Sequence, residues 1–169
     1  MILLPPLTIC AFSPIFREAF RTMLRESWTE TYSGELGKEV AKAMTERLST
    51  DDLAGLVPSR DEQAVIALQD NEICGSAISA ARGNITYLWG VYVLQRFQRQ
   101  GIGRALLAKA VLAHSMDNVV EIFVLKSSIG AIKFYEGLGF KPTSEDDLEI
   151  LPGLSYPSMT MQIPASALV

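Results

Sequence analysis

Two glycines one residue apart, Gly101 and Gly103, follow a basic, glutamine-rich segment and open onto a helical pattern. A glycine lets the backbone approach another group closely, because it carries no side chain. The helix expected after these residues directs unpaired N–H groups and the positive end of its dipole toward the same place. This combination is typical of a phosphate-binding site.

Charge is distributed unevenly around this loop. No Asp or Glu occurs from Ile73 to Met116, while the same window contains five basic residues: Arg82, Arg96, Arg99, Arg104 and Lys109. The chain has 169 residues and a net charge of −4, which argues against a general nucleic-acid-binding protein. A locally positive region within an acidic protein suits an anionic ligand.

Other phosphate-binding loops fit the residues less well. A dinucleotide-binding fingerprint has a third glycine where Leu106 stands, and a strand immediately before its first glycine. The Lys-Ser/Thr pair of a Walker loop is absent. A plain tight turn that leads into a helix, with no ligand, stays open as the structural alternative.

Length and composition predict one globular domain over residues 1–169, since 49% of the residues are hydrophobic. Cys10 and Cys74 lie in apolar, strand-like runs, which predicts reduced thiols and a cytoplasmic location. Residues 1–6 contain no basic residue and end in a proline pair, so we expect no signal peptide. No apolar run is long enough to cross a membrane, and we expect neither a membrane partner nor a metal site.

The first elements that position the loop follow from residue periodicity. A strand is expected at residues 7–12, followed by a helix that Ser13 caps and Pro14 begins. Apolar residues at helical spacing continue this helix until a break at residues 32–34. A second helix is expected from about residue 37 to residue 48.

Three strands are expected next, at residues 63–69, 72–81 and 85–94, and the short turns between them predict an antiparallel meander. The glycine loop then leads into a helix at residues 103–114. Residues 119–125 are almost all apolar, as is typical of a strand that is covered on both faces.

The C-terminal part adds a helix that begins at Ser127 or Ser128 and ends at Gly139. We expect a strand, an acidic loop and a last strand after it, at residues 140–144, 145–149 and 156–163. This order of elements predicts a mixed α/β sheet, in which the two helices after the middle strands form right-handed crossovers.

Three segments resemble the GCN5-related N-acetyltransferase (GNAT) superfamily. Gln98-Arg-Gln-Gly101-Ile-Gly103 is similar to its Q/R-x-x-G-x-G/A signature for acetyl-coenzyme A. Residues 91–93 lie where the family's fourth strand lends main chain to the cofactor, and residues 128–140 are similar to its Asn-x-x-Ala-x-x-Phe-Tyr helix with a following Gly-Phe. The resemblance spans essentially the whole chain. It implies a mixed, mostly antiparallel α/β sheet of about seven strands flanked by about four helices, with splayed fourth and fifth strands.

The resemblance implies acetyl-coenzyme A as co-substrate. Its pyrophosphate is expected at the N–H groups of the loop, which are those of Gln98, Arg99, Gln100, Gly101, Ile102, Gly103 and Arg104. The pantetheine arm is expected along the main chain of Val91 and Val93. The N–H group of Tyr92 or Val91 would polarise the thioester carbonyl, with Gly90 allowing a bulge. Ser128 replaces the usual Asn and is expected to cap its helix and to bond the pantetheine.

By the same resemblance, Tyr135 is the catalytic residue that protonates the departing thiolate. A thiol has a pKa of about 8.5 and leaves fairly well unaided, so Tyr135 is expected to accelerate the reaction without being indispensable. A core tyrosine beside Phe134 is the alternative. His114, the only histidine, is expected at a helix C-terminus and is discounted as a base.

A base for the amine is less visible, because the acid-free window covers the strand on which many family members carry a Glu. An alkyl amine of pKa about 10.4 is unprotonated in only about one molecule in 2,500 at pH 7, which corresponds to about 4.6 kcal/mol. Three explanations for the loss of this proton stay open. An ordered water chain could remove it, Glu26 or Glu30 could act as the base, or the substrate amine could have a low pKa.

Acceptors in this family usually bind near the first two helices and the loop between the last two strands. The first place holds Glu26, Trp28, Glu30, Tyr32 and Glu35, and the second holds Glu145, Asp146, Asp147 and Glu149. We therefore expect a small cationic amine or a peptide amine as acceptor, although these acids are equally consistent with a solvated surface. A module that binds acyl-coenzyme A without turnover stays open as a second function. Many family members dimerise, and the apolar residues 165–169 with the last strand are the candidate homodimer surface.

Overall fold

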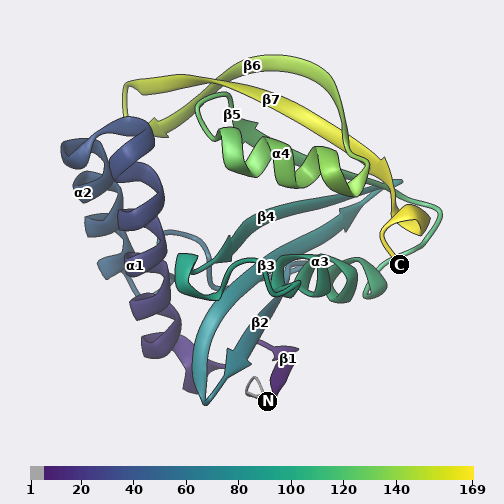
Figure 1. The fold of residues 1–169 in the computed structure, drawn as a ribbon, viewed down its shortest axis with the longest axis horizontal. Helices are drawn as coiled ribbons and strands as arrows, with labels where there is room; N and C mark the ends of the chain where they lie inside the picture. The colour runs from purple at the N-terminus through teal and green to yellow at the C-terminus, as the bar shows by residue number, and fades with distance from the viewer. Residues whose placement is uncertain (1–5) are drawn as a thin grey trace.

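The short connections of the middle segment fold as an antiparallel meander. The computed structural model describes residues 6–169. The expectation of no signal peptide was based on residues 1–6, and residues 1–5 lie outside the described part. Seven strands form one sheet in the order β1-β2-β3-β4-β5-β7-β6 (Figure 1). Their bounds are Leu7–Ala11 (β1), Gln63–Gln69 (β2), Glu72–Arg82 (β3), Ile85–Val93 (β4), Val119–Leu125 (β5), Lys141–Leu151 (β6) and Leu154–Pro164 (β7).

The α-helices are Arg17–Leu36 (α1), Lys38–Glu46 (α2), Ile102–Leu112 (α3) and Ile129–Leu138 (α4). Short 3-10 turns occur at Pro14–Phe16 (η1), Arg47–Ser49 (η2), Gln95–Phe97 (η3) and Ala165–Ala167 (η4). Helix α1 packs on one face of β2–β4 through a core that includes Phe20, Leu24 and Ile78, while α2 packs against α1 and adds Met44 to this core. Helices α3 and α4 belong to a second core, which includes Leu106, Leu107 and Tyr135. Within residues 6–169, no helix combines the length and the apolar character needed to cross a membrane.

The predicted mixed sheet is confirmed. Strands β2 to β4 pair antiparallel, and β4 with β5 is the parallel pair of an otherwise antiparallel sheet. Asp70 and Asn71, with φ of 52° and 61°, form the tight turn between β2 and β3. The strands at residues 63–69 and 119–125 begin and end where the sequence predicts.

The predicted break of the first helix at residues 32–34 is wrong. Helix α1 continues through Gly34 to Leu36 and ends at Gly37, whose φ of 92° is unfavourable for other residues. Trp28, Tyr32 and Leu36 extend the apolar stripe at four-residue spacing, and all three pack against the core beneath α1. The burial of this stripe outweighs the cost of about 1 kcal/mol for one glycine within a helix. Ser13 precedes η1 rather than α1, and its side chain makes no capping bond.

The predicted acidic loop at residues 145–149 is also wrong, because these residues lie within β6. Glu145 pairs with Met159, and Glu149 pairs with Ser155, in an antiparallel ladder with β7. Strand β6 is the edge of the sheet, and charged side chains on an edge strand oppose pairing with another chain. The C-terminal segment begins with Ala165, which is fully buried, so part of the candidate dimer surface belongs to the protein's own core.

The fourth and fifth strands diverge, as the resemblance implies. Only Ile85–Leu88 of β4 pairs with β5, and both strands then continue without pairing to each other. A bulge marks the divergence: Ile78 opposes Trp89 and Ser76 opposes Tyr92, which leaves two residues of β4 opposite Ala77. Gly90 adopts a φ of 58° there, as expected for a bulge glycine, and its carbonyl accepts a hydrogen bond of 2.7 Å from the Ser76 hydroxyl.

Candidate active site

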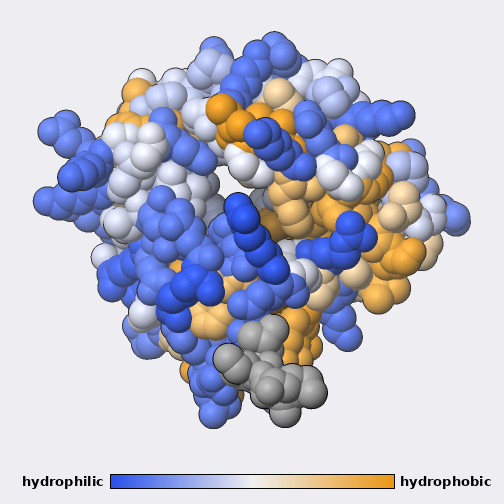
Figure 2. All heavy atoms as spheres, in the orientation of Figure 1, coloured by the Kyte–Doolittle hydropathy of each residue, from blue (hydrophilic) through white to orange (hydrophobic). Residues whose placement is uncertain are grey.

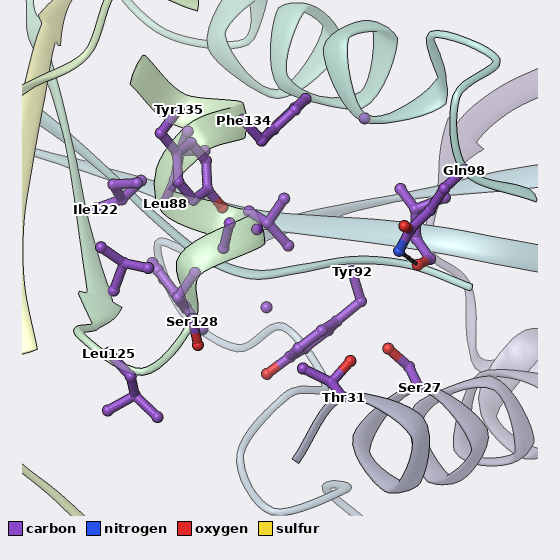
Figure 3. A pocket seen from close by; sticks show the side chains of 18 of the residues that line it. Ser27, Thr31, Leu88, Tyr92, Gln98, Ile122, Leu125, Ser128, Phe134 and Tyr135 are labelled. Atoms are coloured by element: carbon purple, nitrogen blue, oxygen red, sulfur yellow. Dashed lines mark hydrogen bonds between the residues drawn. The ribbon is translucent and has the colours of Figure 1, made fainter. Parts of the chain in front are cut away.

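The divergence of β4 and β5 opens a cavity of about 1120 Å³. Its walls come from α1, β4, the glycine loop, the start of α3, β5, α4 and the end of β6. Figure 3 shows Tyr92 of β4, Tyr135 and Ser128 around this space, with Ser27 and Thr31 of α1 on the opposite side. On the face shown in Figure 2, the surface is hollowed near its centre, with hydrophilic side chains along the opening.

The two glycines of the loop serve different purposes. Gly101 precedes α3 with a left-handed φ of 79°, and no atom lies within 4 Å of the position that a side-chain Cβ would take. Gly103 lies against α4, since a Cβ there would stand 3.0 Å from Cζ of Phe134. Thus Gly101 sets the backbone turn, and Gly103 allows α3 to approach α4. The sequence predicted that the backbone approaches another group closely here, and at Gly103 that group is the Phe134 side chain of the protein itself.

Most residues predicted for the cofactor line the cavity: Val91, Tyr92, Val93, Gln98, Arg99, Gly101, Ile102, Gly103, Arg104 and Ser128. The Gln98 amide donates a hydrogen bond of 2.9 Å to the carbonyl of Val93, which ties the loop to β4 (Figure 3). Gln100 is not among the lining residues, and its side-chain oxygen accepts a bond of 3.3 Å from the Gln69 amide. The loop therefore borders the cavity, except for the side chain of Gln100.

Charges of both signs face the cavity. Arg99, Arg104 and Lys133 supply positive charge near the start of α3 and along α4. Lys133 was missed by the sequence reasoning, although its spacing from Gly130, Phe134 and Gly137 places all four on one face of a helix. The carboxylates come from α1 and β6, namely Glu30, Glu35 and Glu149. An elongated ligand with an anionic part and a cationic part suits this distribution.

Tyr135 lies between aromatic rings at the cavity wall. Its side chain is 7% exposed, and its ring centroid lies 5.2 Å from that of Phe134 and 5.3 Å from that of Phe140. Burial, with a smaller effect from Tyr92, raises the pKa of the Tyr135 hydroxyl well above its usual range. Tyr135 therefore keeps its proton at neutral pH and is available as a hydrogen-bond or proton donor.

A second aromatic group, Trp28, Tyr32 and Tyr92, lies at the α1 side. The hydroxyls of Tyr32 and Tyr92 are 3.4 Å apart, and Trp28 packs edge-on against both rings at 6.4 and 6.2 Å. Burial raises the pKa of Tyr32 and that of Tyr92. Tyr32 and Tyr92 line the cavity, whereas Trp28, also predicted to contact substrate, is buried behind them.

These raised pKa values predict the alkaline behaviour of the protein. Folding favours the protonated hydroxyls of Tyr32, Tyr92 and Tyr135, so their contribution to stability is complete below pH 10, the ordinary tyrosine value, and decreases as the pH rises further. At a pH of about 11, absorbance at 295 nm should report fewer ionised tyrosines in the folded protein than in denaturant. Equal ionisation in the two states would contradict this prediction.

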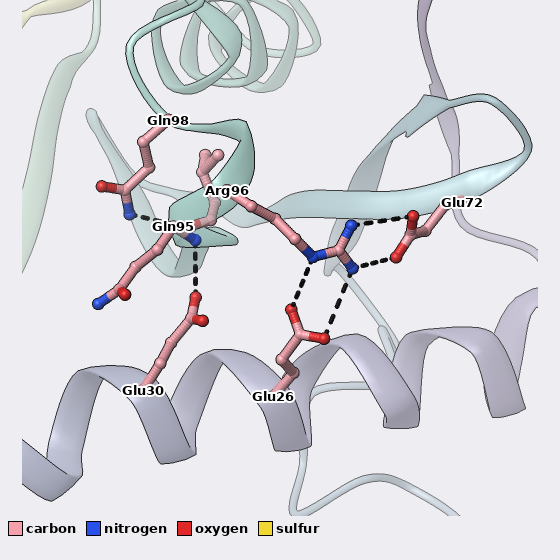
Figure 4. A network of polar contacts seen from close by, with 7 residues as sticks. Glu26, Glu30, Glu72, Gln95, Arg96 and Gln98 are labelled. Atoms are coloured by element: carbon pink, nitrogen blue, oxygen red, sulfur yellow. Dashed lines mark hydrogen bonds and ion pairs between the residues drawn. The ribbon is translucent and has the colours of Figure 1, made fainter.

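Two predicted acceptor-binding acids hold η3, the turn before the glycine loop, to α1 (Figure 4). Glu26 pairs with Arg96 at 3.3 Å, and Arg96 also forms a two-bond ion pair with Glu72. These bonds raise the pKa of Arg96, and Arg96 lowers that of Glu72. Glu30 accepts a bond of 2.7 Å from the backbone N–H of Gln95. Glu26 does not line the cavity, whereas Glu30 does.

Ser128 precedes α4, but its side chain makes no capping bond, contrary to the expectation. Its hydroxyl donates instead to Oε2 of Glu35 at 2.6 Å, which connects α4 to the last turn of α1. His114 follows α3 and is not among the cavity residues, as expected. Its Nε2 lies 2.8 Å from the Ser79 hydroxyl, and burial lowers its pKa.

The sequence profile of the family described as "Acetyltransferase (GNAT) domain" matches residues 29–163 of the chain. A curated relative, the uncharacterized N-acetyltransferase YuaI of Bacillus subtilis (strain 168), is 27% identical over 149 residues. That match covers 80% of this chain and 84% of the relative.

Solved structures share the fold. The PaiA N-acetyltransferase of Thermoplasma acidophilum, solved in complex with coenzyme A, superposes with a TM-score of 0.75 at 21% identity, covering 94% of this chain and 99% of that chain. The ribosomal-protein-S18-alanine N-acetyltransferase of Escherichia coli gives 0.70 at 18% identity, covering 95% of each chain. YncA of Salmonella typhimurium, a putative acetyltransferase solved with acetyl-CoA, gives 0.61 at 16% identity, covering 94% of each chain.

Proposed function

Because the chain belongs to the GNAT acetyltransferase family, we propose that it transfers the acetyl group of acetyl-coenzyme A to a primary amine within this cavity. One observation carries the proposal: the glycine loop, the diverging end of β4 and Tyr135 face a single space. Similar structures were solved with coenzyme A or acetyl-CoA, which supports the same ligand here.

The residues present fit this co-substrate. Arg99, Arg104 and Lys133 provide positive charge for its phosphates, beside the N–H groups at the start of α3. Beyond Leu88, the main chain of β4 is not paired with β5, so its open edge is available to an extended arm, except for the Val93 carbonyl, which accepts from Gln98. A cavity of about 1120 Å³ is large enough to hold both an extended cofactor arm and an acceptor.

The chemistry of each group follows from its place. The thioester supplies the acetyl carbon that the amine attacks. The N–H group of Val91 or Tyr92, next to the bulge, is the donor for the oxygen on which negative charge develops. The Tyr135 hydroxyl, which is protonated at neutral pH, gives its proton to the sulfur as the carbon–sulfur bond breaks.

A cationic acceptor, either a small amine or a peptide amine, is supported by the carboxylates that face the cavity. Glu30, Glu35 and Glu149 line it, and positive charge in this space lies on the lining residues Arg99, Arg104 and Lys133. The two acids considered as bases are less suited to that task, because Glu26 is paired with Arg96 and Glu30 holds the N–H of Gln95. The proton of the acceptor amine is then better removed through an ordered water chain, or the amine has a low pKa and is already unprotonated.

The proposal is tested by measuring thiol release from acetyl-coenzyme A with a panel of amines. We expect release with spermidine or an N-terminal peptide amine, and about tenfold or more lower kcat/KM with an amine that carries a carboxylate, since placing that group near these acids is unfavourable. Equal activity toward the acidic amine would refute the cationic acceptor. Cofactor binding without thiol release for any amine would favour the acyl-coenzyme A-binding module.

A further inference from the structure

Glu35 is the α1 carboxylate that the fold leaves available to a ligand. We propose that Glu35 binds a positively charged nitrogen of the acceptor other than the amine that is acetylated, and that Ser128 positions its carboxylate for this purpose. This inference rests on the proposed function and names the residue that selects its acceptor. Glu35 lines the cavity, and its side chain is neither fully buried nor fully exposed.

The position of Glu35 is fixed from across the cavity. Ser128 lies 93 residues away in sequence, is 6% exposed, and donates its hydroxyl proton to Oε2 of Glu35 at 2.6 Å. A serine before a helix commonly bonds a backbone N–H of the first turn, but this one does not. The hydroxyl is therefore committed to the carboxylate, which holds it in one orientation at the wall of the site.

The charge of Glu35 is not neutralised by the protein. Among residues 6–169, no Lys, Arg or His nitrogen lies within 4.0 Å of its carboxylate, whereas Glu26 has Arg96 and Glu30 has the N–H of Gln95. The neutral Ser128 hydroxyl uses one of about four acceptor positions that a carboxylate offers. Removing such a group from water is costly unless a partner compensates its charge. A cationic ligand is the partner that would do so.

The neighbours of Glu35 suit the same kind of ligand. The charge of Glu35 is one of the smaller effects that raise the pKa of Tyr32, after burial and Tyr92, which reflects how close the two side chains lie. Tyr32 and Tyr92 both line the cavity, and the face of an aromatic ring attracts an ammonium group. Glu149 also lines the cavity, but its side chain is exposed and its charge is screened by water.

Glu35→Gln tests the inference, since the amide still accepts the Ser128 bond but has no charge. The probes are spermidine and a peptide amine that also carries a positively charged side chain, compared with an arylamine that is neutral at pH 7. We expect KM and the calorimetric Kd of the cationic probes to rise about tenfold, with both values for the arylamine unchanged. Coenzyme A affinity should not change. Glu39→Gln, the same charge change on the exposed first turn of α2, is the matched control and should leave every value at the wild-type level.

Ser128→Ala tests the orientation of the Glu35 carboxylate while its charge is retained. It should raise KM for the cationic probes about threefold, and Ser128→Thr, which retains a hydroxyl, should restore it. Equal losses for cationic and neutral acceptors in Glu35→Gln, or no preference of the wild type for a cationic probe, would overturn the inference. The proposed function fails separately, if the wild type binds coenzyme A but releases no thiol. The calorimetric comparison of wild type and Glu35→Gln does not depend on turnover.

Discussion

The Tyr135→Phe variant is expected to release thiol from acetyl-coenzyme A roughly a hundredfold more slowly than the wild type. The hydroxyl is at the cavity wall and is protonated throughout the neutral range. Removing it deprives the leaving sulfur of a proton donor while the ring still packs between Phe134 and Phe140. The loss belongs at the lower end of the range for acid catalysis, because a thiolate also leaves without protonation.

The effect should fall on kcat and not on cofactor binding. Coenzyme A affinity, measured by calorimetry, should be unchanged in Tyr135→Phe, because the contact is expected to matter only as the carbon–sulfur bond breaks. As a control, Tyr87→Phe removes a tyrosine hydroxyl from β4. Tyr87 does not line the cavity, so this variant should retain wild-type kinetics. A Tyr135→Phe enzyme with an unchanged rate would remove Tyr135 from the mechanism.

Gly90→Ala should destabilise the protein by about 2–4 kcal/mol and weaken coenzyme A binding at least tenfold. Gly90 has a φ of 58°, which costs a non-glycine residue about 1–2 kcal/mol. A Cβ there would also stand 2.7 Å from Cδ1 of Ile78, which is completely buried and has little room to move. Relief of that contact would shift the bulge, and with it the unpaired backbone of β4 that faces the cavity.

Gly83→Ala is a matched control that measures only the cost of placing alanine at a positive φ. Gly83 lies in the turn before β4 with a φ of 65°, and no atom lies within 4 Å of the position of its Cβ. Urea denaturation should therefore give a loss of about 1–2 kcal/mol for Gly83→Ala, with normal cofactor affinity. If the two variants lose equal stability, the contact with Ile78 does not constrain the bulge.

Elements with strong local patterns could be predicted from the sequence. Strand β5 is almost continuously apolar because both of its faces are largely covered, and its limits were predicted correctly. The loop and α4 carry motifs whose spacing directly reflects geometry, such as the left-handed glycines Gly101 and Gly139 at helix ends. Of the eleven residues predicted for the cofactor, ten line the cavity, and three of these lie on β4, where the prediction came from the family resemblance.

Errors arose where distant contacts decide the outcome. The end of α1 depends on burial of Tyr32 and Leu36 against the sheet, which outweighs the local preference of Gly34. The acidic part of β6 is a strand because β7 pairs with it, although its composition is typical of a loop. The partners of Glu26 and Glu35 lie 70 and 93 residues away, so local sequence cannot distinguish an acid that holds a loop from one that faces a cavity.

The bonds from Glu26 and Glu30 join α1 to η3, the turn before the glycine loop, while Glu35 lies in the last turn of α1 and faces the cavity. Glu35 lies five positions, or about 7.5 Å of helix, beyond Glu30, the nearer of the two acids that bond η3. Substitution of Glu35 alone should therefore leave the bonds to η3 in place. This separation gives a protein engineer one position to vary when seeking new acceptors.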